Sequence, residues 1–459
     1  MANEYKVNNK GSNNLINTSL PMAVLSPNFK TRKYSTPFGY EKTERWQDVD
    51  TNNKILECYK DVSIDKDIEL TTDFSVPTFN TCTTFANDSG IESSYVYIYA
   101  LKGEPNYICY TFQSVTDKID SEGKVTTTTS YIKNTNPAFT QADRIIVNLQ
   151  AGGGSGGGSS QAYGLGVALG GNDGGAGGSG AFASVILNTK ILKEHPCTLD
   201  SNGTPKIGSY CFQIILGRYA KPVIGSAGWL LAGSGFHYGY DGENGGDAKI
   251  LYRHGGPFSD TLISLSGGRG GTNASNESNN AYIDGAPGAG GIASKETEYE
   301  NSIYWTVPIY NGSRKEGDGL LNGLTGGPVD KDAPASPSYT LKPYKNYDYY
   351  LLTSNIGGYS GGKLYGDVGA PGGAASYLGS GANGQNPDVA AYQGGYGAGG
   401  GGGKWSYNFW SLFNIITLGL GSIVGGFAND IVYACGGEWS DKSIHYGGAG
   451  GKSCVQIYY

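Results

Sequence analysis

Glycine is concentrated in the last two-thirds of this chain, and its distribution constrains the fold more than any other feature. Only five of the 76 glycines lie in residues 1–150, whereas 71 lie in residues 151–459. Ordering a glycine costs about 0.5–1 kcal/mol more than ordering an alanine. A folded region of this composition therefore needs close backbone packing and dense hydrogen bonding. The change in composition also predicts a domain boundary close to residue 140.

Short apolar stretches, which we expect to form strands, follow four of the glycine clusters and separate this region from other glycine-rich sequences. A flexible glycine and serine linker lacks such stretches, and collagen needs glycine at every third position with abundant proline. We expect closely packed, polyproline-II-like glycine loops, which have no internal hydrogen bonds and bond to their neighbours instead; loose loops are the alternative. The clusters and the stretches after them are residues 174–180 and 181–187, 285–291 and 292–294, 369–373 and 374–378, and 447–451 and 453–459.

The composition divides the chain into three parts. Residues 1–40 are rich in asparagine, serine, lysine and proline, which predicts an extended N-terminal arm. Residues 41–140 are expected to form a small β domain, and residues 141–459 a glycine-rich β domain with an apolar insertion at 405–434. The expected fold class is therefore all-β.

Strand signals are clearest on both sides of the boundary. Residues 95–99 and 107–112 are almost entirely aromatic or β-branched, which favours strands. A turn signal at 120–123 lies between two short β-prone runs and predicts a hairpin. The stretch 144–149 is a further predicted strand and leads directly into the first glycine cluster.

The charge and the cysteines exclude several functional classes. A net charge of −7 and a pI near 5.2 argue against nucleic acid as a partner, because phosphate binding needs clustered lysine and arginine. The seven cysteines contain no CxxC pair, and the four histidines have no metal-ligand spacing, so no metal site is expected. Most cysteines are interpreted as small buried hydrophobic residues of a chain made in a reducing compartment. The N-terminus has no secretory signal.

Two glycine motifs superficially resemble nucleotide-binding loops. Residues 152–157 follow a predicted strand, but a dinucleotide fingerprint needs a helix after it, and more glycine follows here. Residues 450–453 resemble the end of a P-loop, but Tyr446 stands where that motif needs glycine. We expect no cofactor. No nucleophile or zinc-protease signature is present either, and the chain is expected not to be an enzyme.

Three stretches resemble the glycine-rich domain at the ends of bacteriophage tail fibres and related virion appendages. They are the strand and glycine run at 144–158, the second strand at 177–185, and the closing strand at 450–459. The large insertion at 295–355 and the apolar block near 410 depart from the family pattern. The resemblance implies a multimeric adhesin, with a trimer favoured, whose exposed loops contact a host surface glycan or protein. It also implies that residues 1–140 dock onto other virion proteins.

Aromatic loops are the candidates for receptor contact. Tyrosine offers a large contact area with little loss of side-chain entropy. The alternative is that these rings cap and separate the glycine layers. The candidates are Tyr344, Tyr347, Tyr349, Tyr350, Tyr392, Tyr396, His237 and Tyr238.

The segment from Trp405 to Asn429 carries no charge over 25 residues. That length reaches the threshold for a membrane span, but early asparagines and later glycines argue against an ordinary transmembrane helix. A buried apolar helix or hairpin at a subunit interface is the favoured interpretation, and a hydrophobic tip that touches a membrane is the other alternative. The residues for either contact are Trp405, Phe409, Trp410 and Phe413.

These observations together predict a viral structural protein. It is expected to be a tail-fibre or appendage subunit that mediates host attachment by receptor binding. It would be made in the host cytoplasm and located in the virion, in the bacteriophage tail or a surface appendage. The alternatives are a carbohydrate-degrading appendage enzyme, since paired carboxylates can come from anywhere in a chain, and a decoration protein with no receptor role.

Overall fold

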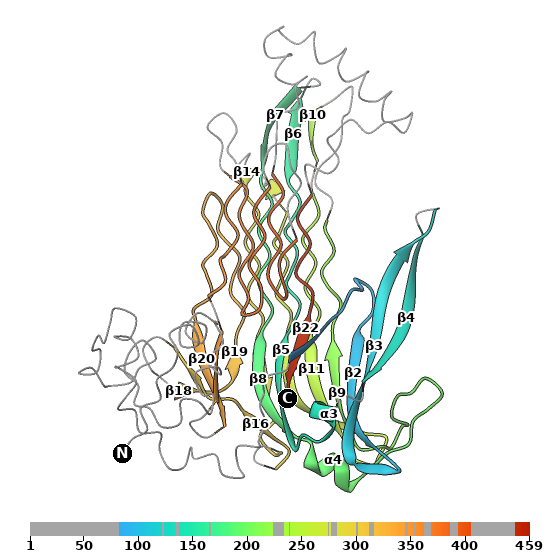
Figure 1. Ribbon diagram of the computed structural model, residues 1–459. Coiled ribbons are helices and arrows are strands. Elements are labelled where there is room, and N and C mark those ends of the chain that lie inside the picture. Colours follow the sequence, from blue (N-terminus) through green and yellow to red (C-terminus); the bar gives the residue numbers. More distant parts are fainter. Residues whose placement is uncertain are drawn as a thin grey trace, which may run out of the picture.

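The computed structural model is nearly all β, as the sequence predicts (Figure 1). Within the residues it describes, the only helices are the short α3 (Pro137–Thr140) and α4 (Lys190–Glu194). The strand pairs are antiparallel throughout. The described residues are 82–121, 124–134, 137–164, 167–223, 234–237, 239–273, 275–276, 282–299, 302–311, 316–344, 348–352, 354–361, 369–385, 393–404 and 446–459.

The larger of two principal sheets has seven strands. Its strand order mixes the first part of the chain with the glycine-rich part. In that order the strands are β15 (Ala293–Lys295), β12 (Ser259–Leu265), β11 (Ala248–Arg253), β9 (Cys211–Leu216), β2 (Ser94–Leu101), β3 (Glu104–Ile119) and β4 (Val125–Asn134). β3 and β4 form the predicted hairpin, which pairs Ile119 with Val125 next to the turn.

The second principal sheet has six strands and brings the two ends of the described chain together. The first described strand pairs with the last, with Cys82 opposite Tyr458. The strand order is β1 (Cys82–Ala86), β22 (Cys454–Tyr458), β5 (Arg144–Gln150), β8 (Phe182–Asn188) and β16 (Tyr304–Thr306), and β19 (Leu320–Leu321) also pairs with β8.

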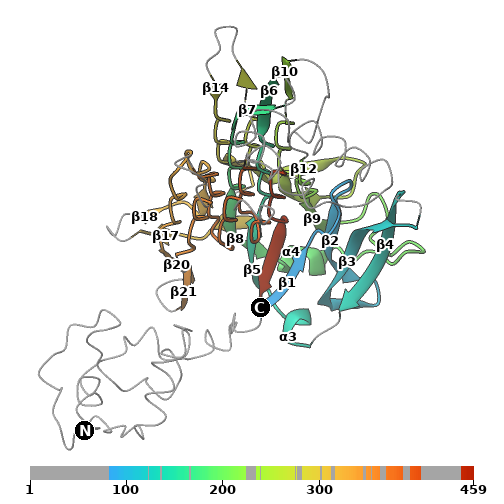
Figure 2. The same cartoon turned by 90° about the horizontal axis from the view of Figure 1, so that it is seen from above.

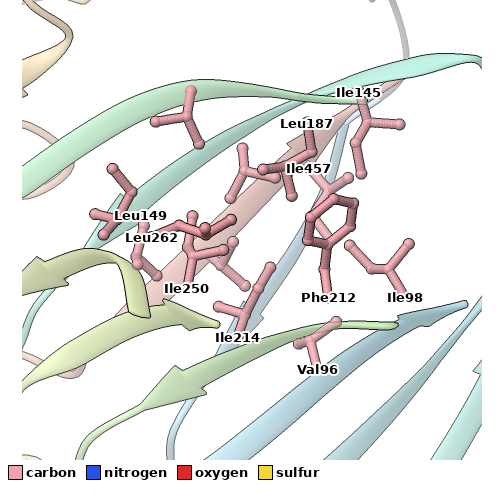
Figure 3. Close-up of a cluster of buried hydrophobic side chains, with 14 of the residues drawn as sticks. Val96, Ile98, Ile145, Leu149, Leu187, Phe212, Ile214, Ile250, Leu262 and Ile457 are labelled. Carbon is pink, nitrogen blue, oxygen red and sulfur yellow. The ribbon is translucent and has the colours of Figure 1, made fainter. Parts of the chain in front are cut away.

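The main hydrophobic core lies between these two sheets (Figure 3). Alternation places the apolar side chains on the inner face, because successive residues of a strand point to opposite faces. On β11, for example, Ala248, Ile250 and Tyr252 are buried and their neighbours are half-buried. The seven-stranded sheet contributes Val96, Ile98, Phe212, Ile214 and Ile250 to this core, and the six-stranded sheet contributes Ile145, Leu149, Leu187 and Ile457.

Three smaller sheets lie outside this main core, and the four-stranded one packs in a second buried cluster on the six-stranded sheet. β6 (Ser160–Gly164), β7 (Val167–Asn172) and β10 (Ser234–His237) form one of them, at the end of the molecule opposite the large sheets (Figure 1); the three strands lie close together in the view from above (Figure 2). β13 (Ser275–Asn276) and β14 (Tyr282–Ile283) form a short hairpin. The third sheet has four strands, β18 (Glu316–Gly317), β17 (Ile309–Tyr310), β20 (Tyr339–Tyr344) and β21 (Asp348–Leu352).

Both principal sheets cross the expected domain boundary near residue 140. β2 pairs with β9, and β1 pairs with β22, so the described part of the expected N-terminal domain does not form a sheet of its own. The physical reason is burial: Val96 and Ile98, on the apolar inner face of β2, share one core with Ile145, Leu149 and Leu187 from the later part of the chain. The strand expected at 374–378 is also wrong, since these residues form loop and bends.

Candidate functional site

The glycine runs lie side by side between the large sheets and the small sheet of β6, β7 and β10 (Figure 1). We call them the glycine bundle, and we call the small sheet with the adjoining ends of the runs the far end. Run 151–159 leads from β5 towards β6, and run 173–181 returns from β7 to β8. The bundle includes the runs at residues 151–159, 173–181, 239–247, 266–273, 284–292, 396–404 and 446–453.

Successive residues of run 151–159 donate backbone hydrogen bonds to three neighbouring runs in rotation. Every third residue returns to the same neighbour, so the pattern repeats after three residues. In chain order the bonds join Gly152 to Gly246 (3.1 Å), Gly153 to Gly451 (2.9 Å), Gly154 to Gly178 (2.9 Å), Ser155 to Glu243 (2.9 Å), Gly156 to Gly448 (2.9 Å) and Gly157 to Gly175 (2.8 Å). Residues 151–159 are thus surrounded on three sides by other backbones.

Run 173–181 has the same three-residue repeat. Every third N–H group of the run, beginning at Gly174, donates to run 396–404, and every third one beginning at Gly175 donates to run 266–273. Every third carbonyl group, beginning at Asp173, accepts from run 284–292. The bonds to run 396–404 are from Gly174 to Gly403 (2.8 Å), Gly177 to Gly400 (2.9 Å) and Gly180 to Gly397 (2.8 Å). Those to run 266–273 are from Gly175 to Thr272 (2.9 Å), Gly178 to Arg269 (2.9 Å) and Ala181 to Ser266 (3.1 Å).

Steric exclusion explains why these positions are glycine. A Cβ built on Gly153, Gly154 or Gly156 would lie within 3.0 Å of a backbone atom of a neighbouring run. Real Cβ atoms essentially never approach so closely, and a backbone held by hydrogen bonds cannot move aside as a flexible side chain can. The bundle therefore depends on glycine at the positions that face another run.

The position of a run within the bundle determines how many glycines it needs. Run 173–181 is enclosed, and up to Gly180 it has side chains only at Asp173, Ala176 and Ser179, one residue in three. In run 239–247 the positions that a Cβ would block include Gly239, Gly242 and Gly245, again every third residue. The intervening positions carry tyrosine, aspartate, glutamate and asparagine.

A buried ion pair lies where the bundle meets the far end. Lys404 Nζ is 3.4 Å from Asp173 Oδ2, and the two side chains are only 0% and 2% exposed. The backbone N–H of Lys404 donates to Gln385 Oε1 (2.6 Å), and the N–H of Asp173 donates to Asp284 Oδ1 (3.1 Å). These contacts tie together the ends of three runs, at 173, 284 and 404.

The structure separates the sequence-predicted contact residues instead of gathering them. His237 ends β10 at the far end, opposite Gln161 of β6. Tyr344, Tyr349 and Tyr350 lie in β20 and β21 of the four-stranded sheet, away from the far end (Figure 1). Tyr396 is 39% exposed at the opposite end of its run, beside the turn at 376–379. Outside the described residues lie Tyr238, Tyr347, Tyr392, Trp405, Phe409, Trp410 and Phe413, together with the arm at 1–40.

Tyr240 is a far-end residue that the sequence analysis did not select. Its side chain is 66% exposed, and its carbonyl accepts the N–H of Gly158 (2.9 Å), which fixes its backbone. The next residue, Asp241, accepts the N–H of Asn273 (2.7 Å). The glycines at 239 and 242 that bracket Tyr240 were the available signal, because glycine at every third position leaves the residues between them on the outside.

The described residues contain no group of three or more histidine, cysteine, aspartate or glutamate side chains that could hold a metal ion. Within the same part of the chain, no helix has the length and apolar character needed to cross a membrane. No protein-family model matches the chain, and neither the curated proteins nor the solved structures include a significant match.

Proposed function

We propose that this protein is a virion structural protein, a tail-fibre or appendage subunit that attaches to the host. In this proposal the glycine runs are polyproline-II helices packed into a stiff bundle, and the bundle presents the far end to a receptor. The observation that carries it is the three-residue rotation of the backbone hydrogen bonds in runs 151–159 and 173–181. A polyproline-II helix has three residues per turn and no internal hydrogen bonds, so it bonds to its neighbours with this repeat.

The bundle suits a presenting role because of its length and its order. At about 3.1 Å per residue, a nine-residue polyproline-II run spans about 28 Å. Lateral bonding in at least three directions restrains runs 151–159 and 173–181 along this length. A far end that is ordered before it meets a partner loses less entropy on binding than a mobile loop does. The buried pair of Lys404 and Asp173 adds to this order where the bundle ends.

The chemistry of the far end is compatible with a glycan or protein partner. Tyr240 is exposed on an anchored backbone, and Asp241 and Asn273 add polar groups beside it. A rigid aromatic ring with adjacent hydrogen-bonding groups is a common arrangement at recognition surfaces. In the proposed assembly the chain is a homotrimer, and residues 1–140 contact other virion proteins.

Cell binding tests this proposal. The fluorescently labelled chain should bind to a subset of a panel of bacterial strains, and an excess of unlabelled chain should compete. Tyr240→Ala should weaken that binding at least tenfold, because an anchored aromatic contact contributes roughly 2 kcal/mol or more. Tyr131→Ala is the matched control, since Tyr131 is also an exposed tyrosine (37%) but lies on β4. Equal loss in both variants, or no loss in Tyr240→Ala, would contradict the far end as the contact surface.

A further inference from the structure

Three buried cysteines with free thiols gather on the outer face of the seven-stranded sheet. Cys109, Cys197 and Cys211 form a small apolar cluster with Tyr99, separate from the main core. Cys109 on β3 is directly opposite Tyr99 on β2. On the other side of β2, the pairing of Ile98 with Phe212 places Cys211 beside Tyr99. Cys109 and Cys211 thus flank the same residue on opposite sides.

Cys197 lies on the same side of β2 as Cys211. Its N–H donates to the carbonyl of Ala100 (2.8 Å), and its carbonyl accepts the N–H of Lys102 (2.9 Å). Leu101, between these two residues, pairs with Glu104 of β3 on the opposite side. Backbone groups of successive residues in a strand point to opposite edges of that strand. Cys197 therefore lies along the edge of β2 that faces away from β3, the same edge as Cys211. It is beside Leu101, two residues along β2 from Tyr99.

This placement decides which cysteines can be joined. Two residues along a strand correspond to about 6.6 Å, whereas two strand spacings correspond to about 9.6 Å. Cα atoms joined by a disulfide are usually about 4.4–6.8 Å apart, and beyond about 7 Å the backbone has to move. Cys197 and Cys211 are therefore within reach of each other. Cys109 lies across β2 from both, too far for either.

The surroundings of the pair favour the same choice. The hydroxyl of Tyr99 lies 2.8 Å from Oγ1 of Thr111 on β3, so that its ring leans towards β3 and away from Cys211. Arg253 of β11 is directly opposite Cys211, and its guanidinium donates to the carbonyl of Lys206 (3.0 Å) in the segment between the two cysteines. A nearby arginine stabilises a thiolate, which is the attacking species in disulfide exchange.

We propose that Cys197 and Cys211 form an intramolecular disulfide when the folded chain meets an oxidising medium. The oxidant is a low-molecular-weight disulfide such as oxidised glutathione. The thiolate of Cys197, the more exposed of the two at 5% against 0%, attacks the oxidant, forms a mixed disulfide and releases one glutathione thiolate. The thiolate of Cys211 then attacks the Cys197 sulfur and releases the second glutathione. The two protons lost by the cysteines end on the two glutathione thiols.

The disulfide would fix in place the segment that covers the outer face of the seven-stranded sheet. Residues 197–211 leave the sheet at Cys197 and rejoin it at Cys211, and Gly203 between them accepts a hydrogen bond from Thr111 on β3 (2.8 Å). Oxidation would close this loop covalently after folding. Burial raises the pKa of Cys197 to about 11 and the pKa of Cys211 to about 12. The thiolate fraction, and with it the oxidation rate, should therefore rise about tenfold per pH unit from pH 7 to pH 9.

Peptide mapping tests the proposal on the full chain. The protein, purified in its reduced form, is incubated with oxidised glutathione, blocked with an alkylating reagent and digested without reduction. The expected product is a peptide pair that joins Cys197 to Cys211, lighter by two hydrogens than the two thiol peptides. Cys109→Ser should give the same product, and Cys197→Ser should not. The peptide map of the unsubstituted chain decides the question by itself. The proposal can therefore be refuted even if the variants fail to fold.

Three results of that map would overturn the proposal. They are a disulfide between Cys197 and Cys109, glutathione retained on Cys197 without a link to Cys211, and unmodified thiols throughout. None of these results depends on whether the protein binds to cells, so the failure of this inference is distinct from the failure of the proposed function.

Discussion

Replacing Gly177 with alanine should destabilise the protein strongly, because Gly177 lies in the enclosed run 173–181. A Cβ at this position would overlap the carbonyl group of Gly154 in the neighbouring run. Gly177 also donates to Gly400 (2.9 Å) and accepts from Ala374 (3.1 Å), while Gly154 accepts from Gly400 (2.9 Å). The added methyl group therefore forces apart backbones that are joined by three hydrogen bonds.

The size of this effect follows from two contributions. Overpacking a dense interior costs about 1–3 kcal/mol, and each of the three strained hydrogen bonds contributes about 1 kcal/mol. The smaller conformational entropy of alanine in the unfolded chain offsets about 0.4–1 kcal/mol. We expect a net loss of about 3–6 kcal/mol in the free energy of unfolding, measured by urea denaturation with circular dichroism.

Gly317→Ala is the matched control for Gly177→Ala. Gly317 lies in the exposed strand β18, and a Cβ there would be 3.5 Å from the Ile309 side chain, an ordinary contact. This variant should stay within about 0.5 kcal/mol of the unsubstituted protein. If Gly177→Ala were as stable as Gly317→Ala, the steric argument for the glycine bundle would be refuted.

Three further predictions concern the ion pair, the closing strand and the buried tyrosines. Asp173→Ala should cost about 3–5 kcal/mol in unfolding free energy, because it leaves Lys404 buried without its carboxylate. The double variant Asp173→Leu with Lys404→Met should cost much less. Equal losses in the two proteins would contradict this prediction. Deleting residues 454–459 removes β22 from between β1 and β5, and the truncated chain should fail to give a cooperative unfolding transition; a normal transition would show that β22 is dispensable. Burial raises the pKa of both Tyr97 and Tyr99 to about 12. Their neutral forms stabilise the fold fully below the ordinary value near 10, and this contribution should be lost between about pH 10 and pH 12. The tyrosinate absorbance of these two residues should rise together with unfolding. Full ionisation of both tyrosines by pH 10.5 in a protein that is still folded would contradict the prediction.

Local patterns were sufficient to predict most of the strands near residue 140. The aromatic and β-branched run at 95–99 lies within β2, and the turn signal at 120–123 connects β3 to β4. The stretch 144–149 forms nearly all of β5. In β2 burial largely alternates, and in β5 every residue from Ile145 to Gln150 is buried, so strand propensity and packing agree in both.

The arrangement of these strands could not be read from local patterns. β5 pairs with β22, about 300 residues later, and β2 pairs with β9 across the expected boundary. Such pairings depend on which apolar faces can cover one another, and a single sequence gives no signal for that choice. The stretch 374–378 has a local apolar pattern but forms no strand. Its backbone is held in the bundle instead, where the N–H of Ala374 donates to the carbonyl of Gly177.

The candidate site was predicted only in part, for a related reason. His237 was selected because it lies among aromatic residues, and it is at the far end. Tyr344 was selected on the same ground but lies in the four-stranded sheet. Aromatic composition does not indicate which end of a long bundle a loop occupies. The better signal is glycine at every third position, as at Gly239 and Gly242, which places Tyr240 on the outside of a run.

Amide hydrogen exchange of the glycine runs is the most direct test of whether they form an ordered bundle. Residues 152–158 and 174–181 should be protected to the same degree as the amides of β5 and β8, because nearly all of their N–H groups donate to a neighbouring run. Exchange of these glycines at the rate of an exposed loop, while β5 and β8 remain protected, would contradict the claim that the runs form an ordered bundle.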